Sequence, residues 1–209
     1  MKKSATIIYP EYNGLYINLT NRCPCNCTFC IRQKKNSAFE NVSSLWLEKE
    51  PSVQDVIKAI TEESKIERFK NYKEFVFCGY GEPTCALNVL LKTADYLKNN
   101  YSLPIRINTN GLGNLINGKN ILPLFKGKID VISISLNSSN PEIYNKTVRS
   151  IYGENAFPAM LDFASQAVKI IPKVILSTVD STITHEDEEE CRKICQKIGA
   201  IYRIRKFIN

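Results

Sequence analysis

The sequence predicts an α/β protein built on a curled parallel sheet. Six segments with the alternation of β-strands are separated by segments with helical periodicity, and parallel neighbours need such crossovers. Strands covered by helices on both faces are continuously apolar, whereas these alternate apolar with polar residues. A sheet curled around a polar ligand, bound at the carboxyl ends of the strands, accounts for both observations. An antiparallel sheet with one face in water is the alternative.

The alternation is clearest in the first, third and fourth predicted strands. In the third strand, for example, Ile105 and Ile107 alternate with Arg106 and Asn108. A buried polar face is costly unless it is hydrogen-bonded, so the polar sides are expected to share one interior. The six predicted strands span residues 15–20, 74–78, 105–109, 131–137, 173–179 and 202–208.

Helix start signals lie between these strands. Ser52, with Asp55 three residues later, has the pattern of a capping box. Asn140 followed by Pro141 combines an N-cap residue with proline at the first helical position. Thr184 precedes an acidic stretch that suits the positive end of a helix dipole. Further helices are predicted at about 84–99, 114–124 and 155–170.

Length and composition are those of one globular domain, expected to span residues 1–209. No apolar run reaches membrane-spanning length, and the apolar piece 5–10 is too short for a signal peptide. We therefore expect a cytoplasmic protein, in which clustered cysteines indicate metal or redox chemistry rather than disulfides. The net charge of +7 allows nucleic acid or an acidic protein as partner, although excess lysine is more often a matter of solubility.

Three of the eight cysteines, Cys23, Cys27 and Cys30, have the spacing C-x3-C-x2-C. Three thiolates on one short loop can converge on one soft metal centre, but zinc and ordinary iron–sulfur clusters take four ligands. Either a fourth protein ligand comes from elsewhere, as in structural zinc, or one metal position stays open for a reacting molecule. Cys25 is out of register with the three and is expected to be a free thiol.

The remaining cysteines and the single histidine are expected to be structural. Cys78 lies in a predicted strand and Cys85 at a helix start, where small core residues are common. Cys191 and Cys195 lie one turn apart, close enough for a metal or redox pair, yet no further ligand is near and packing is favoured. His185, among acidic residues in a first helical turn, is expected in solvent, which argues against a Ser-His-Asp hydrolase.

Three more motifs follow the predicted strands. They are Gly79-Tyr-Gly-Glu-Pro83, Asn108-Thr-Asn-Gly111 and Ser133-Ile-Ser-Leu-Asn137. Together with the cysteine loop and Phe29 before its last cysteine, they resemble the motifs of the radical S-adenosylmethionine (SAM) superfamily. The resemblance covers nearly the whole chain and is strongest to the small TatD-associated branch.

This resemblance implies a partial (β/α)6 barrel, similar to a TIM barrel, as a single radical SAM core domain. Cys23, Cys27 and Cys30 would bind three irons of a [4Fe–4S] cluster and leave the fourth iron for the amino and carboxylate groups of SAM. An electron from the reduced cluster would cleave SAM to a 5′-deoxyadenosyl radical, which abstracts hydrogen from an unidentified substrate. The cofactor performs the difficult step and the protein positions it.

The same resemblance implies a set of SAM contacts. Phe29 would lie near the adenine, Glu82 would accept from the methionine ammonium, and Arg149 would bind the carboxylate. Residues of the fourth strand would contact the ribose or the carboxylate. The full predicted set is Phe29, Gly79, Gly81, Glu82, Asn110, Ser135, Asn137 and Arg149.

Partners follow from the same chemistry. A flavodoxin or ferredoxin is the expected electron donor, and basic residues flanking the cysteines would dock an acidic protein. These residues are Arg22, Arg32, Lys34 and Lys35. A functional association with a TatD-family hydrolase is also implied. Near the carboxyl end, Arg203, Arg205 and Lys206 either face a substrate phosphate or carboxylate in the lumen or are ordinary surface charge.

Two other functions remain open. One is a compact deazaguanine-type synthase of the same superfamily, which would need magnesium and a pterin-like substrate. The other is a non-catalytic module that binds metal or nucleic acid. The Gly-Glu-Pro segment and the polar strand faces speak against a binding module, since it needs neither.

Overall fold

The computed structural model describes residues 6–33 and 44–207. In this part of the chain seven strands form one sheet, and their spatial order follows the sequence. The first two strands are antiparallel, whereas every later neighbouring pair is parallel. The strands are β1 (Ile8–Glu11), β2 (Gly14–Ile17), β3 (Glu74–Phe77), β4 (Ile105–Thr109), β5 (Val131–Ser135), β6 (Lys173–Val179) and β7 (Ile201–Arg205).

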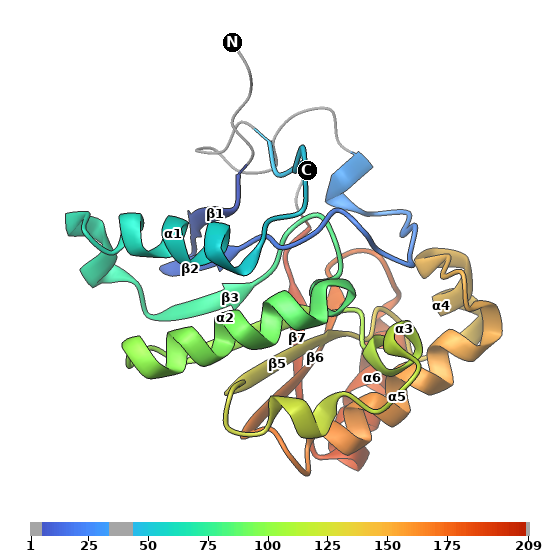
Figure 1. Ribbon diagram of the computed structural model, residues 1–209. Coiled ribbons are helices and arrows are strands. Elements are labelled where there is room, and N and C mark those ends of the chain that lie inside the picture. Colours follow the sequence, from blue (N-terminus) through green and yellow to red (C-terminus); the bar gives the residue numbers. More distant parts are fainter. Residues whose placement is uncertain (1–5, 34–43, 208–209) are drawn as a thin grey trace.

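Helices connect the parallel strands and lie along the outer side of the sheet (Figure 1). The α-helices are α1 (Val53–Glu63), α2 (Leu87–Asn100), α3 (Gly113–Asn117), α4 (Pro141–Val148), α5 (Ala156–Ala167) and α6 (His185–Ile198). Short 3-10 helices are η1 (Ile31–Gln33), η2 (Glu67–Asn71), η3 (Pro83–Ala86), η4 (Leu122–Phe125) and η5 (Gly153–Asn155). Within the described residues β1 and β7 do not pair with each other, so the sheet stays open. The predicted curled α/β sheet is confirmed, and β2–β7 are its six predicted strands.

The hairpin of β1 and β2 was not predicted. Glu11 pairs with Gly14, and the two residues between them, Tyr12 and Asn13, have φ of 45° and 64°. Two central residues with positive φ are the requirement of a type I′ turn, the turn that suits the twist of a two-residue hairpin. The dipeptide Asn13-Gly14 indicates a turn at this place and could have revealed the hairpin, although it lies one residue beyond the central pair Tyr12-Asn13.

The predicted limits of the other strands are correct for β4 and β6, but β2 and β5 end two or three residues early. Beyond β5, Asn137 adopts the left-handed region with φ 65°, which no extended strand contains. Strand β7 begins at Ile201 and ends at Arg205, and the predicted end at Ile208 lies outside the described residues. The polar residues at the ends of these predicted strands therefore lie in the turns that follow the strands.

The three predicted helix starts are confirmed. Ser52 and Asp55 form both hydrogen bonds of the capping box, and Asn140 and Thr184 accept from backbone N–H groups of α4 and α6. The predicted single helix at 114–124 is wrong. It divides into α3 and η4 because Gly118 ends α3 in the left-handed conformation, with φ 61°. The predicted helix at 84–99 begins instead with the 3-10 turn η3.

The outer face of the sheet forms the hydrophobic core with the helices. Phe77, Ile107 and Ile134 from three strands are fully buried in one cluster with Ile60 of α1 and Leu90 of α2. Burial of each such side chain contributes about 2 kcal/mol. The core therefore holds the strands from outside and leaves their inner face for other use.

The inner face has two different parts. Beside β1–β3 it is aromatic and apolar, with Tyr9, Tyr16 and Val76 in a second buried cluster. Beside β4 and β5 it is polar, since Arg106 and Ser133 are buried there. The expectation that the polar sides share one interior is met for β4 and β5.

The turn after β3 packs very closely on the residues that follow β2. A Cβ atom on Gly81 would lie 2.2 Å from the Thr20 carbonyl oxygen and 2.8 Å from that of Arg22. A Cβ on Gly79 would lie 2.0 Å from Oδ1 of Asn18. Both glycines are thus required for the close approach of these two segments of the chain, which brings the turn against the start of the cysteine loop.

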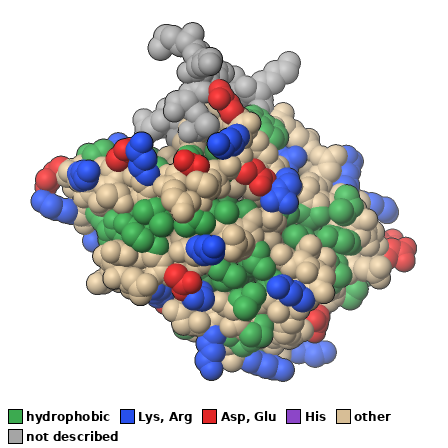
Figure 2. Space-filling view, viewed as in Figure 1, with side chains coloured by type: hydrophobic (Ala, Val, Ile, Leu, Met, Phe, Trp, Pro, Cys, Tyr) green, Lys and Arg blue, Asp and Glu red, His purple; other side chains and the backbone are tan. Residues whose placement is uncertain are grey.

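On the face shown in Figure 2, Lys and Arg side chains are spread among Asp and Glu and are not gathered in one patch. No helix within residues 6–33 and 44–207 combines the length and the apolarity needed to cross a membrane.

Replacement of Gly81 by Ala should destabilise the protein by about 3 kcal/mol, because backbone must move to admit the methyl group. Gly127→Ala is the control, since Gly127 has φ 74° but no atom within 4 Å of an added Cβ. It should cost only about 1 kcal/mol. Denaturant unfolding of both variants measures the difference, and equal losses would contradict the role of close packing.

Candidate active site

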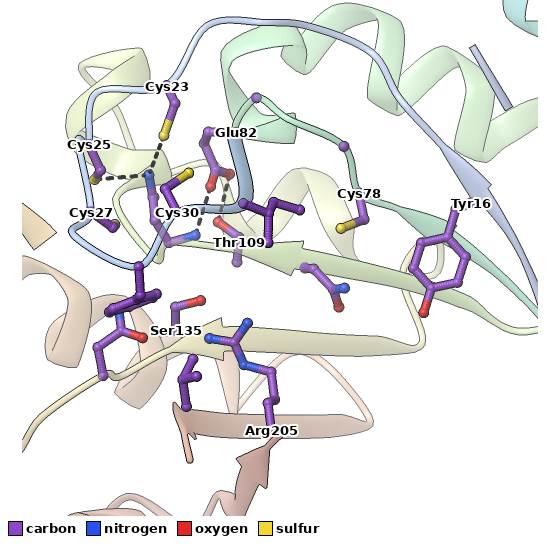
Figure 3. Close-up of a pocket in the computed structure, with 18 of the residues that line it drawn as sticks. Tyr16, Cys23, Cys25, Cys27, Cys30, Cys78, Glu82, Thr109, Ser135 and Arg205 are labelled. Atoms are coloured by element: carbon purple, nitrogen blue, oxygen red, sulfur yellow. Dashed lines mark hydrogen bonds between the residues drawn. The ribbon is translucent and has the colours of Figure 1, made fainter. Parts of the chain in front are cut away.

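A pocket of about 600 Å³ opens on the inner side of the sheet. A pocket of this size is typical of sites for small molecules and cofactors. In Figure 3 the cysteine loop closes one end of the pocket, Tyr16 lies at the other end, and Arg205 reaches in from β7. Residues from the strands and from the turns after them thus converge on one space.

The cysteine loop leaves β2 and crosses to α4. Asn26 N donates to Val148 O at 3.1 Å and Thr28 N to Thr147 O at 2.9 Å, so the last carbonyls of α4 hold the loop. Cys25 forms a β-bridge with Ser150 just beyond the helix. The backbone of the loop is therefore fixed at both sides of Cys27.

All four cysteines of the loop, Cys23, Cys25, Cys27 and Cys30, line the pocket (Figure 3). Hydrogen bonding to Cys25 lowers the pKa of Cys23 and of Cys27, whereas those two bonds raise the pKa of the Cys25 thiol. Burial raises the pKa of Cys30. Of these three thiols, Cys25 is thus the one that ionises least readily.

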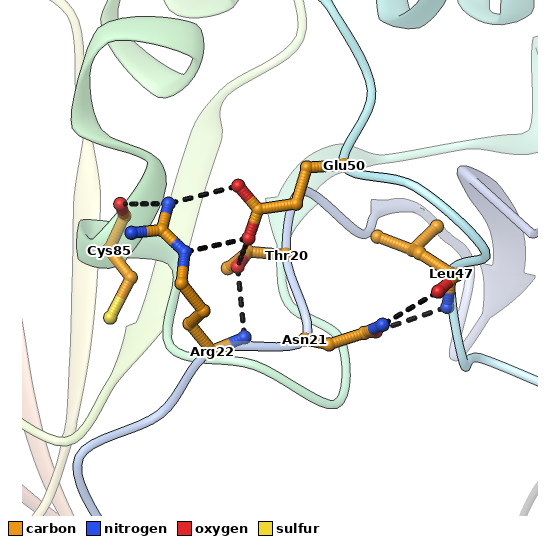
Figure 4. Close-up of polar contacts among 6 residues, drawn as sticks. All are labelled: Thr20, Asn21, Arg22, Leu47, Glu50 and Cys85. Atoms are coloured by element: carbon orange, nitrogen blue, oxygen red, sulfur yellow. Dashed lines mark hydrogen bonds and ion pairs between the residues drawn. The ribbon is translucent and has the colours of Figure 1, made fainter.

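A second support of the loop comes from a network of polar contacts (Figure 4). Arg22 donates from Nε and Nη2 to the carboxylate of Glu50, at 2.8 and 2.9 Å, and from Nη2 to Cys85 O at 2.8 Å. Asn21 Nδ2 donates to Leu47 O at 2.7 Å, and Leu47 N donates back to Asn21 Oδ1 at 3.0 Å. These contacts join the segment before Cys23 to residues 47–50 and to η3.

Glu82 is buried, and four protein donors reach its carboxylate. Oε1 accepts from Thr84 N, Thr84 Oγ1 and Thr109 Oγ1 at 3.2, 2.8 and 2.7 Å, and Oε2 accepts from Asn110 N at 2.7 Å. Burial raises the pKa of Glu82, and these hydrogen bonds oppose the rise. The carboxylate therefore joins the turn after β3 to the end of β4.

Asn110 extends this network to the cysteine loop. Its Nδ2 lies 3.5 Å from Cys25 Sγ and 4.0 Å from Cys23 Sγ, at distances suited to hydrogen bonds with sulfur, and its Oδ1 accepts from Leu112 N at 2.9 Å. Asn110 therefore faces the cysteine sulfurs with a polarised N–H group. Such bonds are one way in which a protein adjusts the properties of an iron–sulfur centre.

Seven of the eight predicted SAM contacts line the pocket: Phe29, Gly79, Gly81, Glu82, Asn110, Ser135 and Asn137. Asn137 is buried, and its Oδ1 has no hydrogen-bond partner among the described residues. A buried acceptor without a donor is costly, which favours a ligand at this place.

Arg149 is the predicted contact that the structure does not bring to the pocket. It ends α4 in the left-handed conformation, with φ 49°, and is exposed. Its Nε donates to Lys146 O at 3.3 Å, which satisfies a carbonyl of the last helical turn. The residue thus serves as the C-cap of α4.

The other cysteines divide into two kinds. Cys191 and Cys195 are buried in the core, as predicted. Cys78 was expected in the core, but it follows β3 on the inner side and lines the pocket. Cys85 is only half-buried in η3.

His185 is exposed at the first turn of α6, as predicted, and its Nδ1 lies 3.6 Å from Oε2 of Glu188. The predicted docking residues Lys34 and Lys35 lie outside the described residues.

Two further residues of the pocket, Arg106 and Tyr16, were not assigned to it from the sequence. Arg106 binds Glu74 through two hydrogen bonds of 2.9 and 2.7 Å and donates to Tyr16 OH at 3.2 Å. Burial raises the pKa of Tyr16 to about 12. The polar positions of the alternating strands already indicated that Arg106 faces the interior, but the pairing across three strands depends on their register.

A partial barrel with a three-cysteine loop after its first parallel strand has the features of an iron–sulfur protein that binds a small molecule at the strand ends. Comparison with known sequence families identifies the class of iron–sulfur protein, because the model of the radical SAM superfamily matches residues 17–200. The chain belongs to the radical SAM superfamily.

Its relatives are enzymes of several kinds. A probable GTP 3′,8-cyclase of Methanocaldococcus jannaschii is 23% identical over 204 residues, which are 95% of this chain and 60% of the relative. The solved structure of Streptococcus suis SuiB bound to precursor peptide SuiA has a TM-score of 0.66 at 17% identity over 92% of this chain and 38% of SuiB. A radical SAM methyltransferase from Sphaerobacter thermophilus has a TM-score of 0.66 at 14% identity over 95% of this chain and 57% of that structure. The chain thus spans less than two thirds of each.

The superfamily uses a [4Fe–4S] cluster and SAM, and SuiB has also been solved with SAM bound. The donors here fit both groups, because three cysteine thiols line the pocket and Asn137 Oδ1 lacks a donor. No three His, Cys, Asp or Glu of the described chain lie close enough to bind a single metal ion. A cluster binds each thiolate at a separate iron, so its ligands need not meet at one point.

Replacement of Glu82 by Gln should destabilise the protein by about 2 kcal/mol. The amide group would place a donor against Thr84, Thr109 or Asn110, which all donate to this carboxylate, and would leave a buried donor unpaired. Denaturant unfolding measures the loss. Glu154→Gln, at an exposed position of η5, is the control with no expected change. Equal stability of both variants would show that the network contributes nothing.

Proposed function

We propose that the chain is a radical SAM enzyme in which Cys23, Cys27 and Cys30 bind a [4Fe–4S] cluster and the adjoining pocket binds SAM. The single observation that carries the proposal is the position of these three cysteines at one end of a pocket of about 600 Å³. When bound, the reduced cluster supplies the electron that cleaves SAM to a 5′-deoxyadenosyl radical, which abstracts hydrogen from a substrate.

The residues of the chain contribute position and environment. The carboxyl end of α4 and the Arg22–Glu50 contacts hold the cysteine loop in place, and Asn110 directs an N–H group at its sulfurs. Asn137 and Ser135 offer hydrogen-bonding groups to SAM from the end of β5. Glu82 maintains the wall between the cysteine loop and β4, and its bound donors favour this structural part over direct capture of the methionine ammonium.

Further parts of the proposal rest on the sequence. We retain the TatD-associated branch, with its implied association with a TatD-family hydrolase, and a single core domain in the cytoplasm. The free cysteines suit a reducing compartment. The substrates in the names of the relatives, GTP and the SuiA peptide, belong to different chemical classes, so neither is carried over to this chain.

Anaerobic reconstitution tests the proposal. The protein should bind about four irons, show cluster absorbance, and form 5′-deoxyadenosine under strong reductant. Cys27→Ala should abolish the cluster, whereas Cys25→Ala, a matched loss of a thiol on the same loop, should leave it in place. Zinc in place of iron, or no SAM cleavage by the loaded wild type, would overturn the assignment.

We also propose that an acidic flavodoxin or ferredoxin docks beside the cysteine loop, near Arg32. This guanidinium lies 5.4 Å from the Trp46 ring, and its Nη1 donates to Tyr80 O at 3.5 Å. Arg32→Glu should slow flavodoxin-driven SAM cleavage about tenfold at low salt, because charge complementarity sets the association rate. Cleavage driven by dithionite should be unchanged. Lys169→Glu, at an exposed position after α5, is the control, and an unaltered flavodoxin rate in Arg32→Glu would refute the docking site.

A further inference from the structure

Two arginines of the edge strand β7 face the pocket. Arg203 and Arg205 are two residues apart, so their side chains leave the same face of the strand, and both line the pocket. Figure 3 shows the guanidinium group of Arg205 directed into the space beside Ser135. Lys206 follows at the exposed rim of the same pocket. These two arginines are therefore not ordinary surface charges.

Neither arginine has an acidic partner among the described residues. The Nε atom of each is buried without a hydrogen-bond partner, and within the described residues the two side chains make one hydrogen bond, from Arg203 Nη2 to Ser133 Oγ at 3.1 Å. Arg106 in the same pocket is different, because Glu74 binds it through two oxygens. Glu74 is close enough to raise the pKa of Arg203, but the described residues show no ion pair between these two side chains.

Two unpaired like charges at half-buried positions are unfavourable. Burial lowers the pKa of both arginines, the nearby charge of Arg106 lowers that of Arg203 further, and Arg203 does the same to Arg205. Arginine forks bind planar or tetrahedral oxyanions through paired hydrogen bonds. An anion bound between the two side chains would satisfy the buried N–H groups and offset the repulsion.

We propose that Arg203 and Arg205 form a subsite for a phosphate group of the substrate, adjoining the SAM pocket. The subsite rests on the proposed function, because it assigns a chemical class to the substrate of that reaction. A phosphate carries up to two charges and three acceptor oxygens, which match two guanidinium groups with Lys206 nearby. A single carboxylate carries half that charge. The SAM carboxylate is the main rival occupant, since Cys27 of the loop lies near Arg205.

The test compares ligand binding in three forms of the reconstituted protein: wild type, Arg203→Met/Arg205→Met and Arg192→Met. Arg192 is the control because it occupies an exposed position of α6, over the Tyr202 ring and 5.1 Å from its centroid. Calorimetric titration uses inorganic phosphate, malonate and SAM separately at constant ionic strength. The double variant removes unpaired charge, so it should unfold at the same temperature as the wild type or higher.

Phosphate should bind the double variant at least tenfold more weakly than it binds the wild type or Arg192→Met. It should bind the wild type more tightly than malonate does, and SAM affinity should stay within twofold in all three forms. Arg203→Lys/Arg205→Lys, which retains the charge but not the fork, should recover part of the phosphate affinity.

Three results would each overturn the subsite. They are equal phosphate affinity in the wild type and the double variant, malonate binding as tight as phosphate, and a tenfold loss of SAM affinity, which would assign the arginines to SAM itself. Iron content and SAM cleavage of the wild type are measured separately. A missing cluster therefore contradicts the proposed function, whereas a loaded, active enzyme without phosphate binding contradicts only the subsite.

Discussion

The buried carboxylate of Glu82 is the contact on which the rest of the site depends. It accepts from Thr84 after β3 and from Thr109 and Asn110 at the end of β4, so two neighbouring strand ends are joined by one side chain. Asn110, placed in this way, reaches the sulfurs of the cysteine loop. A fully satisfied buried network of this kind resists rearrangement, which suits a site that must present its cofactor in one orientation.

The inner face of the sheet combines two environments in one pocket. Tyr9 and Tyr16 make the side near β1–β3 aromatic, with Glu11 and Glu74 contributed by the same strands, whereas Arg203 and Arg205 make the β7 side cationic. The cysteine loop closes one end of this pocket. A SAM molecule and a phosphorylated substrate have such different parts, so the division of the face itself supports binding of two molecules side by side.

Much of the fold could be predicted because its signals are local. The alternation at 105–109, the capping box at Ser52 and the N-cap at Asn140 depend on residues only a few positions apart, and each is confirmed. The strand β1 of the hairpin was not predicted, although the dipeptide Asn13-Gly14 indicates a turn beside it. The helix at 114–124 was wrong because Gly118 ends α3 after little more than one turn.

The sequence by itself determined the three-cysteine spacing, the polar strand faces and the motifs after the strands, since each is a pattern within one segment. Only the tertiary structure decided which of these side chains meet. It directed Arg203 and Arg205 into the pocket, where the described residues give them no acidic partner, kept Arg149 out as a helix cap, and enclosed Glu82 among four donors. Such outcomes depend on the register of neighbouring strands, which contacts distant in the sequence establish.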